Sequence, residues 1–169
     1  MKQAISNEAA LQVLQSRFGS DLFAVGEPYG MLTVHTTRER LIEVLEFIKE
    51  SPELQMNFLT DITAIHYPDR PGAEFDVVYH CHSWPLNFRL RIKVSVSVDD
   101  PSVPTAEPVH LCANWLEREC YDFFGIIFVG HPNLVRILNM DEMDYHPMRK
   151  EYTLEDPTRR DKVDLQFGR

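Results

Sequence analysis

The chain has 169 residues, of which 44% are hydrophobic and 25% are charged, a composition typical of one globular domain with or without an arm. Its net charge of −9 argues against nucleic acid as the main partner, because phosphate binding needs clustered lysines and arginines. No apolar run approaches the ~20 residues of a membrane span, and the start of the sequence lacks the apolar core of a signal peptide. We therefore expect a cytosolic protein, and its three cysteines suit a reducing compartment.

The N-terminal part of the chain predicts a short helix followed by a β-hairpin. Residues 7–18 form the helix, because Leu11, Leu14 and Phe18 recur at helical spacing before a glycine. Two short apolar runs, 22–25 and 31–35, then flank a turn of sequence GEPYG.

A second and stronger helix follows the hairpin and ends at about Glu50, before a proline. Thr36 and Glu39 have the spacing of a capping box at its N-terminus. Its apolar stripe consists of Leu41, Val44, Leu45 and Ile48.

Three strands come next, at residues 56–66, 75–82 and 86–98. The third is the most regular, since seven apolar residues alternate with polar ones along it. On the first strand we expect the core face to consist of Met56, Phe58, Ile62 and Ala64. Clustered strands with segregated helices predict an α+β fold, a small mixed or antiparallel sheet with helices packed on it.

His80 and His82 lie on one face of the second strand and could form half of a metal site. No third ligand is evident near them in the sequence, and zinc needs three or four protein ligands. If the second and third strands form a hairpin, both histidines stand beside Arg89 and Arg91 on the face turned away from the core, with Asp61 as a partial counter-charge. A stand-alone enzyme that uses these histidines and Glu119 is a less favoured alternative.

Redox and nucleotide chemistry find little support in the motifs. Cys81, Cys112 and Cys120 contain no C-x-x-C pair, and an iron–sulfur cluster usually needs four thiolates. We expect these cysteines to be buried as small apolar residues. Neither G-x-G-x-x-G, G-x-x-x-x-G-K-[ST] nor G-x-S-x-G is present.

The densest stretch is WLERECYDFFGIIFVGHP, residues 115–132. We predict a helix from about Val109 to Phe124, with Gly125 as its C-cap. With Leu116 at the centre of the apolar stripe, Glu119 falls at the edge of burial and Arg118 points away from the core. The other members of the stripe are Val109, Cys112, Cys120 and Phe123.

Asp122 lies in the last turn of this helix, where an acidic group opposes the helix dipole. Such a residue needs a nearby cation, and Arg136, just after the Gly-His-Pro turn, is the candidate partner. We favour an ion-pair network that locks the turn. A docking surface for another subunit is the functional alternative, and catalytic acid–base work is least favoured.

The C-terminal segment, 139–169, mixes charges and prolines with little apolar periodicity. Residues 148–169 hold six basic and five acidic residues, so the acidic charge belongs to the body of the chain. We divide the chain into a domain, 1–138, and an extended arm, 139–169, that becomes ordered on a partner. A disordered tail is the alternative. The arm's spaced apolar anchors are Met148, Tyr152, Leu154, Val163, Leu165 and Phe167.

The runs ERECYDFFGIIFVGHPNLVRIL at 117–138 and HPMRKEY at 146–152 resemble the C subunit of proton-translocating NADH:quinone oxidoreductase, respiratory complex I. Together with FLTDITAIHYPD and the strand at 86–98, the likeness covers roughly residues 55–165. Tyr145 stands where the family usually has glycine, so the turn there is expected to differ. The matching residues, which we interpret as partner-docking positions, are Glu117, Arg118, Glu119, Asp122, Gly125, Gly130, His131, Pro132, Arg136, His146, Pro147, Arg149 and Lys150.

The resemblance implies a non-redox structural subunit of the peripheral arm, with its C-terminal arm wrapped on the D subunit, which is similar to the hydrogenase large subunit. It implies no catalytic, cofactor-binding or metal residues in this chain, since FMN and the iron–sulfur clusters lie in partner subunits. The assembled enzyme would pass electrons from NADH to quinone, coupled to proton translocation, on the cytoplasmic side of a bacterial inner membrane. The alternative within the likeness is the equivalent subunit of a membrane-bound hydrogenase or of a ferredoxin-dependent relative.

Overall fold

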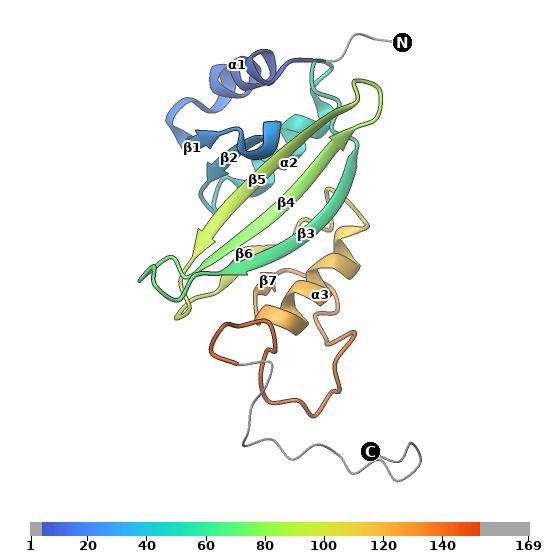
Figure 1. Ribbon diagram of the computed structural model, residues 1–169. Helices are drawn as coiled ribbons and strands as arrows, with labels where there is room; N and C mark the ends of the chain where they lie inside the picture. Colours follow the sequence, from blue (N-terminus) through green and yellow to red (C-terminus); the bar gives the residue numbers. More distant parts are fainter. Residues whose placement is uncertain (1–4, 153–169) are drawn as a thin grey trace.

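The computed structural model describes residues 5–152, which form a two-layer α+β fold and so confirm the predicted class (Figure 1). A five-stranded mixed sheet has the order β1-β2-β5-β4-β3, and a separate two-stranded sheet pairs β6 with β7. The helices are α1 (Asn7–Phe18), α2 (Leu41–Glu50) and α3 (Ala113–Phe124). The strands are β1 (Leu22–Gly26), β2 (Leu32–Thr36), β3 (Phe58–His66), β4 (Phe75–Ser83), β5 (Phe88–Val96), β6 (Ser102–Pro104) and β7 (Ile127–Val129).

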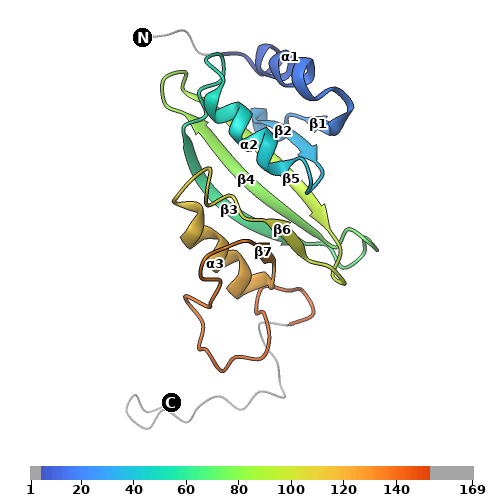
Figure 2. The same cartoon turned by 180° about the vertical axis from the view of Figure 1, so that it is seen from behind.

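The connection through α2 decides the order of the sheet. The chain leaves β2, passes through α2 and enters β3 at the far edge, and β4 and β5 return by antiparallel pairing. Strand β5 therefore lies beside β2 and runs parallel to it. Helices α2 and α3 cover the same face of the sheet, which Figure 2 shows from the helical side.

The core lies between that face and the helices. The predicted stripe of α2, Leu41, Val44, Leu45 and Ile48, is fully buried, which confirms the helical periodicity. The alternation of β5 is confirmed as well, because its apolar residues from Phe88 to Val96 are buried. No helix among residues 5–152 is long and apolar enough to cross a lipid bilayer.

Two local predictions are wrong because the backbone departs from ideal periodicity. A bulge between Leu59 and Asp61 shifts the register of β3, so Leu59 faces the core and Phe58 lies on the opposite face. The capping box is also absent. Thr36 ends β2 and donates its hydroxyl to the carbonyl of Asp21 at 3.1 Å, and α2 begins without a side-chain cap.

The segment 99–112 contains structure that the sequence did not predict. No strand was predicted here and the helix was expected to start at Val109, but residues 102–104 form β6, and α3 begins only at Ala113. Turns precede the helix, since the amides of Val109 and His110 both donate to the carbonyl of Ala106. The apolar run at 126–129 alternates in burial, because its last three residues form β7 beside β6.

Candidate functional site

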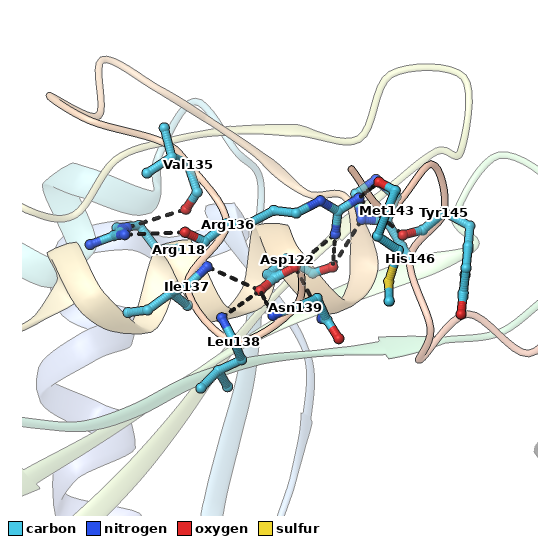
Figure 3. A network of polar contacts seen from close by, with 10 residues as sticks. All are labelled: Arg118, Asp122, Val135, Arg136, Ile137, Leu138, Asn139, Met143, Tyr145 and His146. Carbon is cyan, nitrogen blue, oxygen red and sulfur yellow. Dashed lines mark hydrogen bonds and ion pairs between the residues drawn. The ribbon is translucent and has the colours of Figure 1, made fainter. Parts of the chain in front are cut away.

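The C-terminal end of α3 holds the densest polar network among the described residues, centred on the fully buried carboxylate of Asp122 (Figure 3). Oδ1 accepts from Nη1 of Arg136 at 2.7 Å and from the side-chain amide of Asn139 at 3.0 Å. Oδ2 accepts three backbone N–H groups, those of Ile137 at 3.1 Å, Leu138 at 2.8 Å and Asn139 at 2.9 Å. The predicted partnership of Arg136 with Asp122 is confirmed.

Burial alone would raise the pKa of Asp122. The backbone amides of Asn139 and Leu138, the guanidinium of Arg136 and the Asn139 side chain outweigh it and hold that pKa well below its ordinary value. The group is therefore ionised throughout the physiological range. It acts as an anchor for residues 136–139, because each oxygen has at least two donors.

Arg136 extends this anchor to the next part of the chain. Its Nη1 also donates to the carbonyl of Asp122 at 3.1 Å, and its Nη2 donates to the carbonyls of Met143 at 2.7 Å and Tyr145 at 3.0 Å. Only 11% of its side chain is exposed. One guanidinium thus joins α3 to residues 143–145, which a single ammonium could not do with the same geometry.

The segment 146–149 satisfies the last carbonyls of α3, which have no partner within the helix. His146 donates from Nδ1 to the carbonyl of Asp122 at 3.0 Å, and burial, with Arg149 and Arg136 adding to it, lowers the pKa of this imidazole. The backbone amide of Met148 donates to the carbonyl of Phe123, and Nε of Arg149 donates to the carbonyl of Phe124 at 2.7 Å. Cationic donors at this end also complement the helix dipole. We call Asp122, Arg136, His146 and Arg149 the C-terminal knot.

Gly125 is required at the centre of the knot, and the predicted C-cap is confirmed. Its φ of +76° is the left-handed conformation that favours glycine. A Cβ at this position would lie 2.5 Å from Nη2 of Arg149 and 2.6 Å from the ring of His146. Glycine therefore permits both the helix end and the close approach of the returning chain.

A second set of contacts fixes the chain between the helix and the knot. Arg118 donates to the carbonyls of Val135 and Arg136, each at 3.2 Å, and its guanidinium lies over the ring of Trp115. His131 accepts the amide of Asn133 at Nδ1, so its Nε2 carries the proton and donates to the carbonyl of Asn114 at 3.0 Å. Both side chains tie residues 131–136 to the outside of α3.

The burial of Glu117 shows that α3 turns a different face to the core than the one we predicted. We placed Leu116 at the centre of the buried stripe, but it is only half-buried; Cys120 is buried as predicted, together with Ala113, Glu117 and Phe124, which the wheel did not place there. Glu117 is fully buried, with Oε2 accepting the hydroxyl of Thr105 at 2.5 Å and Oε1 accepting the amide of Ala106 at 2.6 Å. Burial raises its pKa to about 7, although these two donors act in the opposite direction. A wheel based on hydrophobicity cannot find a carboxyl that is buried to hold a turn.

The remaining candidates lie outside the knot. Glu119 and Pro132 are exposed, and Pro147 is half-buried. Gly130 adopts a φ of +89° at its turn. The backbone amide of Lys150 donates to Nδ1 of His66 at 2.9 Å, and its ammonium lies over the ring of Tyr67.

Sequence reasoning missed Asn139, Thr105 and His66, whose contacts join segments far apart in the chain. No local pattern marks these residues, because their roles depend on the tertiary fold. Part of the predicted arm contacts the domain, since residues 146–150 bond to α3 and to His66. The apolar anchors from Leu154 onward lie outside the described residues, and the division at residue 138 stays a prediction.

The other chemical groups are dispersed. Cys81 and Cys120 are buried as predicted, and burial raises the pKa of Cys81 to about 12, whereas Cys112 is exposed because it precedes the helix. The hairpin of β4 and β5 is confirmed and pairs His80 with Arg91 and His82 with Arg89. These histidines alternate along β4 with the core residues Tyr79 and Cys81 and so lie on the other face of the sheet, whereas Glu119 lies on the exposed side of α3, and the structure does not bring them together.

Several large apolar side chains of the C-terminal segment and of the start of α3 are exposed. Leu138, Met140 and Met148 are 64%, 59% and 54% exposed, and they belong to the segment that the knot holds in place. Leu111 and Trp115, at the start of α3, are exposed as well. We interpret the exposed apolar side chains of the segment that the knot holds as a candidate interaction surface.

Residues 34–158 match the family described as respiratory-chain NADH dehydrogenase, 30 Kd subunit. The C subunit of NADH-quinone oxidoreductase from Geobacter sulfurreducens is 42% identical over 153 residues, which cover 90% of this chain and 93% of that protein. The corresponding protein of Geotalea uraniireducens is 41% identical over 159 residues, covering 94% of this chain and 95% of that protein.

Two solved structures share the fold. A trypsin-resistant fragment of Nqo5 superposes with a TM-score of 0.64 at 35% identity, covering 74% of this chain and 98% of the fragment. A chain of an archaeal membrane-bound sulfane sulfur reductase gives a TM-score of 0.71 at 23% identity, covering 87% of this chain and 85% of that chain, and shows the fold alone. The match over most of its length places the chain in the 30-kDa subunit family of respiratory-chain NADH dehydrogenase, as a subunit of NADH-quinone oxidoreductase.

Proposed function

We propose that this chain is a non-redox, structural subunit of the peripheral arm, and that it supports the quinone-reducing module by binding the D subunit, called the hydrogenase-like subunit below. The observation that carries the proposal is the C-terminal knot. Its charged groups hold residues 136–149 against α3, and this segment presents exposed Leu138, Met140 and Met148. Side chains whose donors and acceptors are engaged within the chain are suited to shaping a surface rather than to moving protons or electrons.

In this proposal the chain binds no cofactor of its own, and FMN and the iron–sulfur clusters belong to partner subunits. Electrons pass from NADH to quinone through those partners, coupled to proton translocation. The chain lies on the cytoplasmic side of the inner membrane and contacts the membrane only through the complex. The equivalent role in a hydrogenase or ferredoxin-dependent complex is not favoured, because the two relatives described above, at 42% and 41% identity, are subunits of NADH-quinone oxidoreductase.

The direct test is co-purification from the native host. The tagged full-length chain should recover the hydrogenase-like subunit together with the rest of the peripheral arm, and the recovered complex should reduce quinone with NADH. Recovery of the arm without the hydrogenase-like subunit would contradict the proposed partner. Washing membranes at high pH should release the chain together with the peripheral arm, which tests its peripheral location.

A pair of substitutions tests the structural role. Arg118→Ala or Asp122→Ala should lower the amount of assembled complex, because each releases part of residues 131–139 from α3. The NADH:quinone activity per assembled complex should stay close to that of the wild type. A variant complex that assembles in normal amount but has lost quinone reduction would contradict a non-catalytic role.

Apolar surface substitutions test the docking side chains separately. Leu138→Glu with Met140→Glu should abolish recovery of the hydrogenase-like subunit while the chain itself remains folded, because both side chains are exposed. Val25→Glu is a matched control, since this exposed apolar residue lies on β1, away from the knot.

A further inference from the structure

The five-stranded sheet has a second face that no helix of residues 5–152 covers, as Figure 1 shows from the open side. Strand alternation places on it the polar residues of β3, β4 and β5. The register aligns them in rows across the sheet, with Asp61 beside His80 and His80 beside Arg91. Because the helices lie on the other side of the sheet, this face has no partner layer in the described part of the chain.

The charge of this open face is opposite to that of the chain as a whole, which carries −9. Strand β5 contributes Arg89, Arg91 and Lys93 to it, against the two carboxylates Asp61 and Asp76. Asp76 is buried and already neutralised. It accepts from Arg70 at 2.8 Å and from the Ser95 hydroxyl at 2.7 Å, and Lys93 lies 3.4 Å away.

The two arginines have no such counter-ion. Arg91 makes only a long contact of 3.5 Å to the hydroxyl of Thr33, and neither Arg91 nor Arg89 forms an ion pair with any residue between 5 and 152. A guanidinium offers a planar set of donors that matches a carboxylate. Two such groups therefore stand on adjacent rows of the sheet, free to bind acidic side chains.

A pocket of about 230 Å³ opens beside Arg91. Its apolar lining consists of Ile65 and Val78, and its polar lining consists of Thr63, His80, Arg91 and Lys93. This arrangement suits the side chain of a glutamate or aspartate, because the methylene groups can contact Ile65 and Val78 while the carboxylate binds the cations.

An aromatic cluster borders the basic rows at the end where β4 leads into β5. Trp84 is 66% exposed, and its ring lies 5.2 Å from His82 and 5.9 Å from Phe58, centroid to centroid. His82 is paired with Arg89, so the cluster is continuous with the arginines. Exposed tryptophan beside arginine is the composition that dominates binding energy at protein interfaces.

We propose that the open face of the sheet is a second docking surface, which binds an acidic segment of a neighbouring subunit through Arg89 and Arg91, with Trp84 as the apolar anchor. Charge complementarity identifies the occupant, since elsewhere the acidic body of this chain repels an acidic partner. The surface lies on the opposite side of the sheet from α3 and is distinct from the knot. This inference rests on the proposed role in a multisubunit complex.

Cross-linking in the assembled complex locates the partner. The tagged chain carrying Arg91→Lys is purified with its complex, and a carbodiimide couples the introduced amine to carboxylates in direct contact. Peptide mass spectrometry should find a bond to an aspartate or glutamate of another subunit. Arg17→Lys, the same change on the exposed surface of α1, is the control for non-specific coupling.

Neutralising the arginines tests their contribution. Arg89→Gln with Arg91→Gln should weaken retention of the chain in the complex by about tenfold or more at raised salt, since paired charges at an interface control dissociation. Arg17→Gln with Arg40→Gln removes the same total charge from the helical side and should change retention less than about twofold. The thermal stability of each isolated variant shows whether it is folded.

The outcomes are distinct. The proposal is overturned if the amine at position 91 couples only to residues of this chain or of a second copy. It is also overturned if the amine couples to nothing and the double glutamine variant is retained normally in the complex. Modification of Arg89 and Arg91 by phenylglyoxal tests whether anionic lipid covers the basic face instead. If these arginines react only after the lipid is removed from the complex, the proposal is again overturned. If the tagged wild-type chain recovers no other subunit, the structural role and this inference are both refuted. If the complex is recovered normally but Arg89 and Arg91 react with phenylglyoxal in it, this inference alone is refuted.

Discussion

Replacing Asp122 with asparagine is the sharpest test of the knot. The side chain is fully buried and accepts five hydrogen bonds, two at Oδ1 and three at Oδ2. An asparagine must place its NH2 group where one of the two carboxylate oxygens lies, so that this donor faces the N–H donors that the oxygen accepts in the wild type. Arg136, only 11% exposed, also loses its counter-charge. Removing one member of a buried ion pair costs about 3–5 kcal/mol of unfolding free energy.

The assay is urea unfolding of the full-length chain at pH 7, followed by far-UV circular dichroism. Glu119→Gln is the matched control, because it removes one carboxylate charge from the exposed face of the same helix and should change the unfolding free energy by less than about 0.5 kcal/mol. Trypsin cleavage after Arg136 should accelerate in the Asp122→Asn variant, since residues 136–139 lose their bonds to the Asp122 carboxylate.

The pH dependence adds a second check. A carboxyl whose folded-state pKa is depressed contributes stability that is present above its unfolded pKa of about 3.8 and is lost as the pH falls towards the folded value. The difference between wild type and Asp122→Asn should therefore be constant near neutral pH and shrink below about pH 3.8. A difference below about 1 kcal/mol at pH 7 would refute the reasoning, because it would mean that the five contacts contribute nothing net.

Three further substitutions test neighbouring contacts by urea unfolding. The free energy of unfolding of Glu117→Gln should match that of wild type near pH 4.5 and exceed it by about 3 kcal/mol above pH 7. The reason is the folded-state pKa of about 7, because of which wild type loses this stability as the pH rises from 4.5 to 7. A difference independent of pH would contradict this prediction. Gly125→Ala should cost at least about 1–2 kcal/mol, since the left-handed backbone is unfavourable for alanine and its Cβ meets His146; an unchanged midpoint would refute this close approach. Arg136→Lys should cost about 1–3 kcal/mol, as one ammonium cannot reach both Asp122 and the carbonyls of Met143 and Tyr145, and wild-type stability would show that charge alone suffices.

The open face of the sheet and the knot divide the molecule into two surfaces of different character. Around the knot the exposed side chains include the large apolar groups of Leu138, Met140 and Met148. On the open face they are basic and aromatic, with Arg89, Arg91 and Trp84. A subunit with two such surfaces on opposite sides of its sheet is suited to bridging two neighbours.

Local periodicity in the sequence was enough to predict the regular elements of the fold. The stripe of α2 and the alternation of β5 follow from spacing, because burial on one side requires apolar residues at the period of the backbone. The pair of Asp122 and Arg136 was also predictable, since an acidic residue in the last turn of a helix needs a compensating cation. Gly125 as the helix end belongs to the same group of local features.

Other features depend on contacts between distant segments, and only the folded chain reveals them. The bulge in β3 turned Phe58 away from the core, and the turn at Thr105 and Ala106 drew Glu117 into it, against the wheel prediction. The return of residues 146–149 onto the last carbonyls of α3 likewise depends on groups more than twenty positions away. Polar burial is favourable only where partners converge in space, and the order of residues along the chain does not show where that happens.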